Sequence, residues 1–119
     1  MTTQEVANRL VELCRKGEFE NAQNELFAED AISIEPAPSP AFEKETKGIE
    51  AIKAKGEKWN SMVEKMNGVT LSDALVGTNS FALTMRLDVV MKERGPMDMT
   101  ELCVYQVKDG KITSEQFFM

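Results

Sequence analysis

Carboxylates are the side chains of this sequence best suited to chemistry. The chain has no histidine, which excludes Cys-His and Ser-His nucleophile systems and histidine metal sites. Glu35 stands directly before Pro36, while Glu101 and Glu115 lie in strand-like segments near the end of the chain. Any catalysis must therefore use carboxylates, the single tyrosine Tyr105, lysines or a thiol. We expect no cofactor and no metal, because a small apolar domain offers few oxygen ligands.

These acids could share the work of a proton transfer. Carboxyls in apolar surroundings lose hydration and repel one another, and both effects raise carboxyl pKa values. At least one of the three acids is therefore expected to be neutral near pH 7. A neutral acid can donate a hydrogen bond to a carbonyl while an ionised neighbour takes a proton from carbon, as an enolisation requires.

A period of two in residues 81–92 indicates which side chains share a face with the acids. Apolar side chains occupy the odd positions from Phe81 to Met91, which is typical of a half-buried strand. If the odd positions face the interior, their apolar and polar side chains line a pocket there. Trp59, from the third predicted helix, would complete the wall of that pocket. The expected lining is Met85, Met99, Glu101, Cys103, Tyr105, Glu115 and Phe117.

Each of these residues also has a plain structural interpretation. Glu35 could lie in solvent at a strand end, and a one-residue register slip would turn Glu101 and Glu115 outward. Tyr105 could be a core tyrosine, and Trp59 and the methionines could serve packing alone. The lysines of the third helix are typical of a solvated face.

The elements that position these side chains follow from periodicity and turn residues. Helices are predicted at 3–16, at about 19–27 and at 49–66, the first opened by the capping-box spacing of Thr2 and Glu5. A strand at 31–35 is followed by a proline-rich loop up to Gly48. Further strands are predicted at 69–77, 80–93, 97–108 and 111–118. The order α-α-β-α-β-β-β-β predicts an α+β domain with three helices on a curved antiparallel sheet.

Size and charge limit the classes of function. The 119 residues suit one domain, 1–119, with one ligand site. A net charge of -6 argues against nucleic acid, and no apolar stretch approaches a membrane span. Without a secretory signal we expect a cytoplasmic protein. There the widely spaced Cys14 and Cys103 are expected to stay reduced and buried.

The element order, together with three segments, resembles the nuclear transport factor 2-like superfamily, a cone-shaped fold. The segments are LFAEDAISIEP, the GIEAI start of the third helix and the closing KDGKITSEQFF. Within the superfamily, the chain is most similar to the ketosteroid isomerase and SnoaL-like polyketide cyclase branch. The resemblance covers nearly the whole chain and implies the fold more than the activity.

Residue by residue, the resemblance implies a partial catalytic set. Glu35, before Pro36, stands where ketosteroid isomerases carry their base. Leu10 stands where their oxyanion-binding tyrosine would be, so that group is missing. Glu101 or a neighbour stands at the second oxyanion donor, a neutral acid for which isomerases of this kind are the established example.

Two readings of function remain open. In the first, the chain binds an apolar, carbonyl-bearing small molecule, with Glu35 as base and Glu101 or Tyr105 as electrophile in an isomerase or cyclase reaction. In the second, the same fold is a non-catalytic ligand-binding or dimerisation module. In both we expect a homodimer through an apolar outer sheet face, because such patches usually mark interfaces. That face would carry Val90, Leu102, Val104, Ile112 and Phe118.

Overall fold

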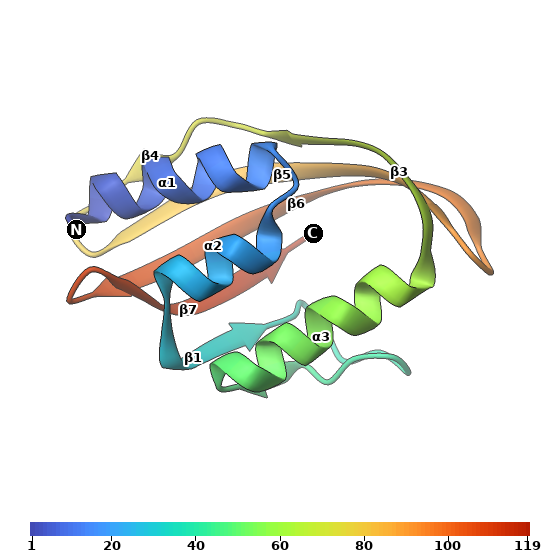
Figure 1. Cartoon of the computed structure of the whole chain (residues 1–119), viewed down its shortest axis with the longest axis horizontal. Coiled ribbons are helices and arrows are strands. Elements are labelled where there is room, and N and C mark those ends of the chain that lie inside the picture. Colours follow the sequence, from blue (N-terminus) through green and yellow to red (C-terminus); the bar gives the residue numbers. More distant parts are fainter.

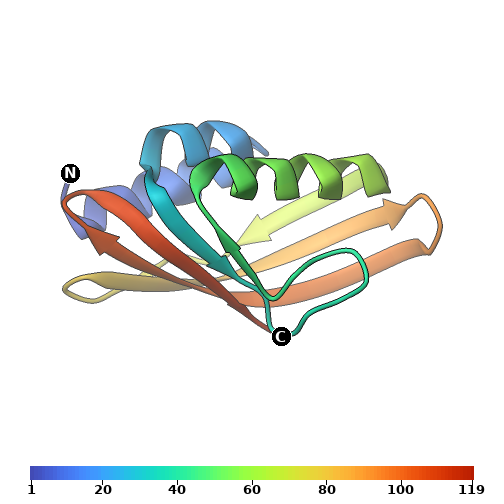
Figure 2. The ribbon, with the colours of Figure 1, turned by 90° about the horizontal axis from the view of Figure 1, so that it is seen from below.

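Three helices lie on one side of a curved seven-stranded sheet (Figures 1 and 2). The computed structural model describes all residues, 1–119. The elements are, in order, α1 (Thr3–Arg15), α2 (Phe19–Leu26), β1 (Phe27–Ile34), β2 (Glu45–Lys47), α3 (Ile49–Met62), β3 (Val63–Leu71), β4 (Leu75–Val76), β5 (Ser80–Met91), β6 (Gly95–Lys108) and β7 (Lys111–Phe118).

Helix α1 has the limits that its sequence predicts. The Thr2 side chain accepts from the backbone N–H of Glu5 at 3.1 Å, and the Glu5 carboxylate accepts from the backbone N–H of Thr2 at 2.9 Å. Two of the free N–H groups at the start of the helix are thereby satisfied. The helix ends before Gly17, whose φ of 76° lies in the left-handed region that favours glycine. Its apolar stripe faces the sheet and is buried.

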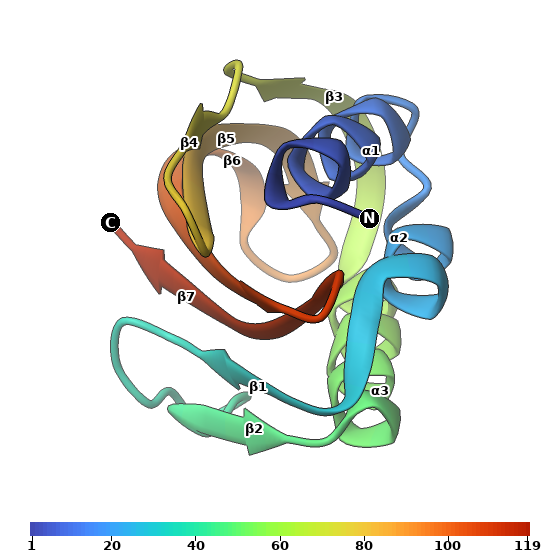
Figure 3. The same ribbon diagram turned by 90° about the vertical axis from the view of Figure 1, so that its left-hand side faces the viewer.

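The sheet is mixed, whereas the sequence predicted an antiparallel one. Its order is β2-β1-β7-β6-β5-β3, with β4 on β5, and β1 runs parallel to β7. All other pairs are antiparallel. Figure 3 shows the sheet curving around the helices. The parallel pair joins strands from opposite ends of the chain, a pairing that no local pattern encodes.

Several element boundaries differ from the prediction. Helix α3 ends at Met62 rather than near residue 66, because Val63 pairs with Met91 in β5 and the backbone N–H of Lys92 donates to the Met62 carbonyl at 2.9 Å. The spacing of the apolar residues from Met62 to Met66 is compatible with a helix or a strand. Pairing with β5 makes the segment from Val63 onward a strand. Phe27 begins β1 instead of ending α2, and a short strand, β2, lies within the predicted loop.

The prediction of an inward odd face is confirmed for β5. All its odd positions from Phe81 to Met91 are buried. In β7 the alternation changes at a bulge, because Gln106 pairs with Ser114 but the next residue of β6, Val107, pairs with Ile112. Thr113 is the extra residue, so Ile112 points inward and is buried. The expectation that Ile112 belongs to the outer apolar face is therefore wrong.

No helix is both long and apolar enough to cross a membrane.

Candidate functional site

The sheet register brings the polar residues of β1 and β7 together. Ser33 of β1 lies beside Glu115 of β7, although 82 positions separate them in the sequence. The Ser33 hydroxyl donates to Glu115 Oε1 at 2.9 Å. On its other side, Glu115 is the register partner of Tyr105 in β6. Glu101 lies further along β6, opposite Met85 of β5. Parallel pairing of β1 with β7 thus builds the centre of the site.

A lysine of α3 completes this cluster. Lys55 Nζ donates to Ser33 Oγ at 2.6 Å and to Glu35 Oε1 at 2.9 Å. Its side chain is only 15% exposed, so the interpretation of the third-helix lysines as a solvated face is wrong for Lys55. Its spacing from Ile52 and Trp59, which also face the core, is a helical signal that sequence reasoning missed.

Burial raises the proton affinity of two of the acids. Desolvation raises the pKa of Glu115 to about 7, although Lys55 and the Ser33 hydrogen bond act in the opposite direction. The pKa of Glu101 is also raised to about 7, first by burial and then by repulsion from Glu35 and Glu115. Both carboxyls therefore exist in protonated and ionised forms near neutral pH.

Glu101 differs from its neighbours in what it contacts. Glu35 and Glu115 each accept a hydrogen bond within the cluster, whereas no protein group donates to the Glu101 carboxyl. Glu115 is only 6% exposed, while Glu101 is half-buried. Glu101 is consequently the acid with both a raised pKa and oxygens free for another molecule.

Apolar side chains surround the acids on the inner face. Lys55 Nζ lies 5.6 Å from the centre of the Phe117 ring. Trp59, Met99 and Phe117 are partly buried and pack against the core, while Met85 and Cys103 belong to the core itself. The predicted lining residues thus lie on the inner face of the domain, and their role in ligand binding stays a prediction.

Tyr105 occupies a core position. It is buried and stacks on Phe81 with ring centroids 4.8 Å apart. Burial raises the pKa of its hydroxyl well above the ordinary value. The structure brings Tyr105 next to Glu115 across the strand pair, and its use as an electrophile stays a prediction.

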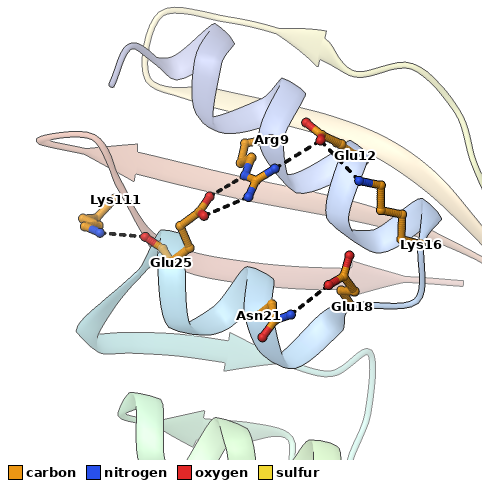
Figure 4. A network of polar contacts seen from close by, with 7 residues as sticks. All are labelled: Arg9, Glu12, Lys16, Glu18, Asn21, Glu25 and Lys111. Carbon is orange, nitrogen blue, oxygen red and sulfur yellow. Dashed lines mark hydrogen bonds and ion pairs between the residues drawn. The ribbon is translucent and has the colours of Figure 1, made fainter.

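Open grooves on the helical surface are separate from the acid cluster. One of about 550 Å³ lies between α1 and α2, where Arg9 pairs with Glu25 at 2.6 Å and with Glu12 at 3.1 Å (Figure 4). Another, of about 530 Å³, runs along α1 towards Asp73 and Ala74. In the first groove these carboxylates already neutralise the arginine. No group of three or more acidic or thiol side chains is arranged to hold a metal.

Comparison with known proteins identifies relatives of the whole chain. A family model described as a SnoaL-like domain matches residues 1–119. No curated protein matches the chain. The fold is very similar to a crystal structure from Mesorhizobium loti, named as a candidate SnoaL-like polyketide cyclase and, in brackets, carbohydrate phosphatase. The TM-score is 0.93 and the identity 32%, over 100% of both chains.

More distant structures share the fold alone. A candidate isomerase from Bacillus subtilis has a TM-score of 0.75 at 16% identity, covering 97% of this chain and 84% of that one. TerC, co-crystallised with polyporic acid, has a TM-score of 0.76 at 14% identity, covering 97% and 88%. The resemblance stated from the sequence is confirmed at the level of family and fold.

Proposed function

The chain belongs to the SnoaL-like domain family, and from this premise we propose that its inner face binds an apolar, carbonyl-bearing small molecule and moves a proton on it. The observation that carries this proposal is Glu101, a half-buried carboxyl with a pKa near 7 and no hydrogen-bond donor from the protein. Such a group can both take and return a proton at neutral pH. Isomerases and aldol-type cyclases require this chemistry.

Glu101 suits the part of the base better than Glu35. The resemblance implies Glu35 for that part, but one of its oxygens is held by Lys55 at 2.9 Å. In the proposed step, Glu101 breaks a C–H bond beside the carbonyl and keeps the proton, while the electron pair moves onto the carbonyl oxygen. Return of the proton at another carbon of a conjugated enolate gives an isomer. Attack of the enolate carbon on a second carbonyl carbon closes a ring, and the alkoxide formed there takes the proton back from Glu101.

Hydrogen–deuterium exchange tests this step without knowledge of the natural substrate. 2-Tetralone is an apolar ketone with exchangeable protons beside its carbonyl, and NMR follows their loss in D2O. We expect the wild-type protein to accelerate exchange, and Glu101→Gln to lower that acceleration by about 100-fold or more. Glu57→Gln, at an exposed position of α3, is the matched control and should leave the rate unchanged. Equal rates for wild type and Glu101→Gln would exclude Glu101 as the proton carrier.

A second candidate function is a non-catalytic ligand-binding or dimerisation module. It is favoured by the partly buried Trp59, Met62, Met97 and Met99, whose side chains pack against the core and fill part of the inner face. In that case 2-tetralone would bind, or fail to bind, without faster exchange. Isothermal titration beside the exchange assay separates these outcomes, and binding without exchange would favour the module.

A further inference from the structure

Lys55 is a positive charge held inside a cluster of acids. It comes from α3, and its Nζ contacts Glu35 of the loop after β1 and Ser33 of β1. Burying an ammonium group costs free energy unless its charge is compensated and its hydrogen bonds are made. Here Glu35 compensates the charge of Lys55, and Glu35 and Ser33 accept its hydrogen bonds. Lys58, one turn further along α3, instead contacts the surface loop and the Phe42 ring.

The geometry leaves Lys55 able to bind one further acceptor. A lysine ammonium has three N–H donors, and the structure gives Nζ two acceptors, at 2.6 Å and 2.9 Å. The Phe117 ring, 5.6 Å away, forms an apolar wall beside it. A carbonyl oxygen of a bound apolar molecule is an acceptor that fits this remaining donor.

Enolisation also needs a donor at the oxygen that gains charge, since such stabilisation is usually the largest catalytic contribution. Few groups of the cluster can supply it. The Ser33 hydroxyl already donates to Glu115, and Tyr105 is buried against Phe81. Lys55 is the one ammonium donor that contacts the acid cluster.

We propose, on the basis of the proton transfer proposed above, that Lys55 is a catalytic residue that binds the substrate's carbonyl oxygen and stabilises its developing negative charge. Glu35 and Ser33 are then positioning residues, which hold the ammonium in place. The substrate is accordingly a neutral apolar ketone or a related carbonyl compound whose oxygen carries negative charge in the intermediate. Glu101 takes the proton and Lys55 binds the oxygen, so the two groups act at different atoms.

Binding of an oxyanion mimic tests the role of Lys55 independently of turnover. 2-Naphthol ionises to an oxyanion with a distinct absorption and fluorescence spectrum, and naphthalene has the same rings without the oxygen. We expect the wild-type protein to bind 2-naphtholate more tightly than naphthalene. Lys55→Met should weaken naphtholate binding by about 10- to 100-fold and leave naphthalene binding unchanged, because one charge-assisted hydrogen bond is lost.

Control variants separate this effect from damage to the fold. Lys58→Met removes a lysine of the same helix that contacts the loop and should bind both probes as the wild type does. The double variant Lys55→Met/Glu35→Met removes both members of this ion pair and should fold, yet still lack the preference for naphtholate. Glu35→Gln keeps an acceptor for Lys55 but not the charge, and should retain part of the preference, whereas Glu35→Ala should not.

Three results would overturn the role of Lys55. They are equal wild-type affinity for naphtholate and naphthalene, unchanged naphtholate binding by Lys55→Met, and trapping of 2-tetralone on Lys55 by borohydride, which would show an imine instead. If the proton-transfer proposal is wrong but the role of Lys55 in binding is right, the two assays give a different result. In that case naphtholate binding depends on Lys55, but no exchange of 2-tetralone depends on Glu101.

Discussion

Glu115 is a carboxyl whose burial links stability to pH. Its pKa is about 7 in the folded chain, against an ordinary value of 4.5. Between these values the folded state keeps a proton that the unfolded state has released, so the free energy of unfolding falls as pH rises. The stabilisation is complete below about pH 4.5 and is lost above about pH 7. The difference corresponds to about 3 kcal/mol.

Replacing Glu115 by Gln should remove most of this pH dependence. The amide oxygen can still accept from Ser33, and it cannot ionise. We expect urea unfolding to show that Glu115→Gln loses about 2 to 3 kcal/mol less than the wild type between pH 5 and pH 8, while Glu101, whose pKa is also raised to about 7, carries the loss that remains. Glu57→Gln should behave as the wild type. An equal loss in wild type and Glu115→Gln would mean that Glu115 does not carry the buried proton.

The two cysteines are expected to be unreactive in the folded chain. Both are buried, and burial raises the pKa of Cys14 to about 12 and the pKa of Cys103 further. Little thiolate forms at neutral pH, so a disulfide-exchange reagent should label the native protein far more slowly than the urea-unfolded protein. Rapid labelling of Cys103 that stops when a ligand is added would instead place its thiol at an accessible part of the site.

At the scale of elements, the bulge in β7 lets both Ile112 and Glu115 face inward, although they are an odd number of positions apart. Thr113 is the extra residue between Ile112, which pairs with Val107, and Ser114, which pairs with Gln106. Its own hydroxyl makes only a long contact of 3.4 Å to the Gln106 carbonyl. Removing it would leave a regular strand in which both Ile112 and Glu115 still face inward.

Deletion of Thr113 should therefore be tolerated far better than a deletion in a regular strand. We expect it to cost less than about 2 kcal/mol, whereas deletion of Thr84 from β5 should cost more than about 3 kcal/mol by turning buried side chains outward. Chemical denaturation of both variants, with Thr113→Ala as reference, measures the difference. Equal destabilisation by the two deletions would show that the bulge itself stabilises the fold.

At the scale of the whole molecule, an apolar patch remains on the outer face of the sheet. Leu102 and Phe118 are opposite each other on β6 and β7 and are 42% and 43% exposed. Val90 and Val104 are partly exposed, while Ile112 is excluded from this face by the bulge. Patches of this kind usually mark interfaces, and a two-fold interface places the same strands together.

We predict that the chain forms a homodimer through this patch. Sedimentation at micromolar concentration should give a mass near twice 13.3 kDa. Leu102→Glu should give a monomer, because it places a charge in the centre of the interface. Ala54→Glu, at an exposed position of α3 on the helical side of the sheet, should remain a dimer. A monomeric wild type would exclude this assembly.

Sequence patterns alone predicted the three helices and the inward face of the longest regular strand pattern, β5. The capping box located the start of α1, and the period of two in β5 predicted its buried face, because these patterns repeat along a single element. Alternation also placed Glu35 on the same side as Ser33, opposite Ile32 and Ile34. The element order and three segments resembled the superfamily, and the match to the family model confirms that resemblance.

Tertiary structure decided how these parts meet. The parallel pairing of β1 with β7 brings Ser33 to Glu115, and the covering position of α3 brings Lys55 to Glu35. The end of α3 at Met62 depends on pairing with β5, and the register of β7 against β6 places both Ile112 and Glu115 inward by means of a bulge. Local periodicity encodes which face of an element is apolar, but contacts between distant elements arise only when the sheet is assembled. For that reason the inward direction of the acids could be predicted from the sequence, while the contacts of Lys55 with Ser33 and Glu35 could not.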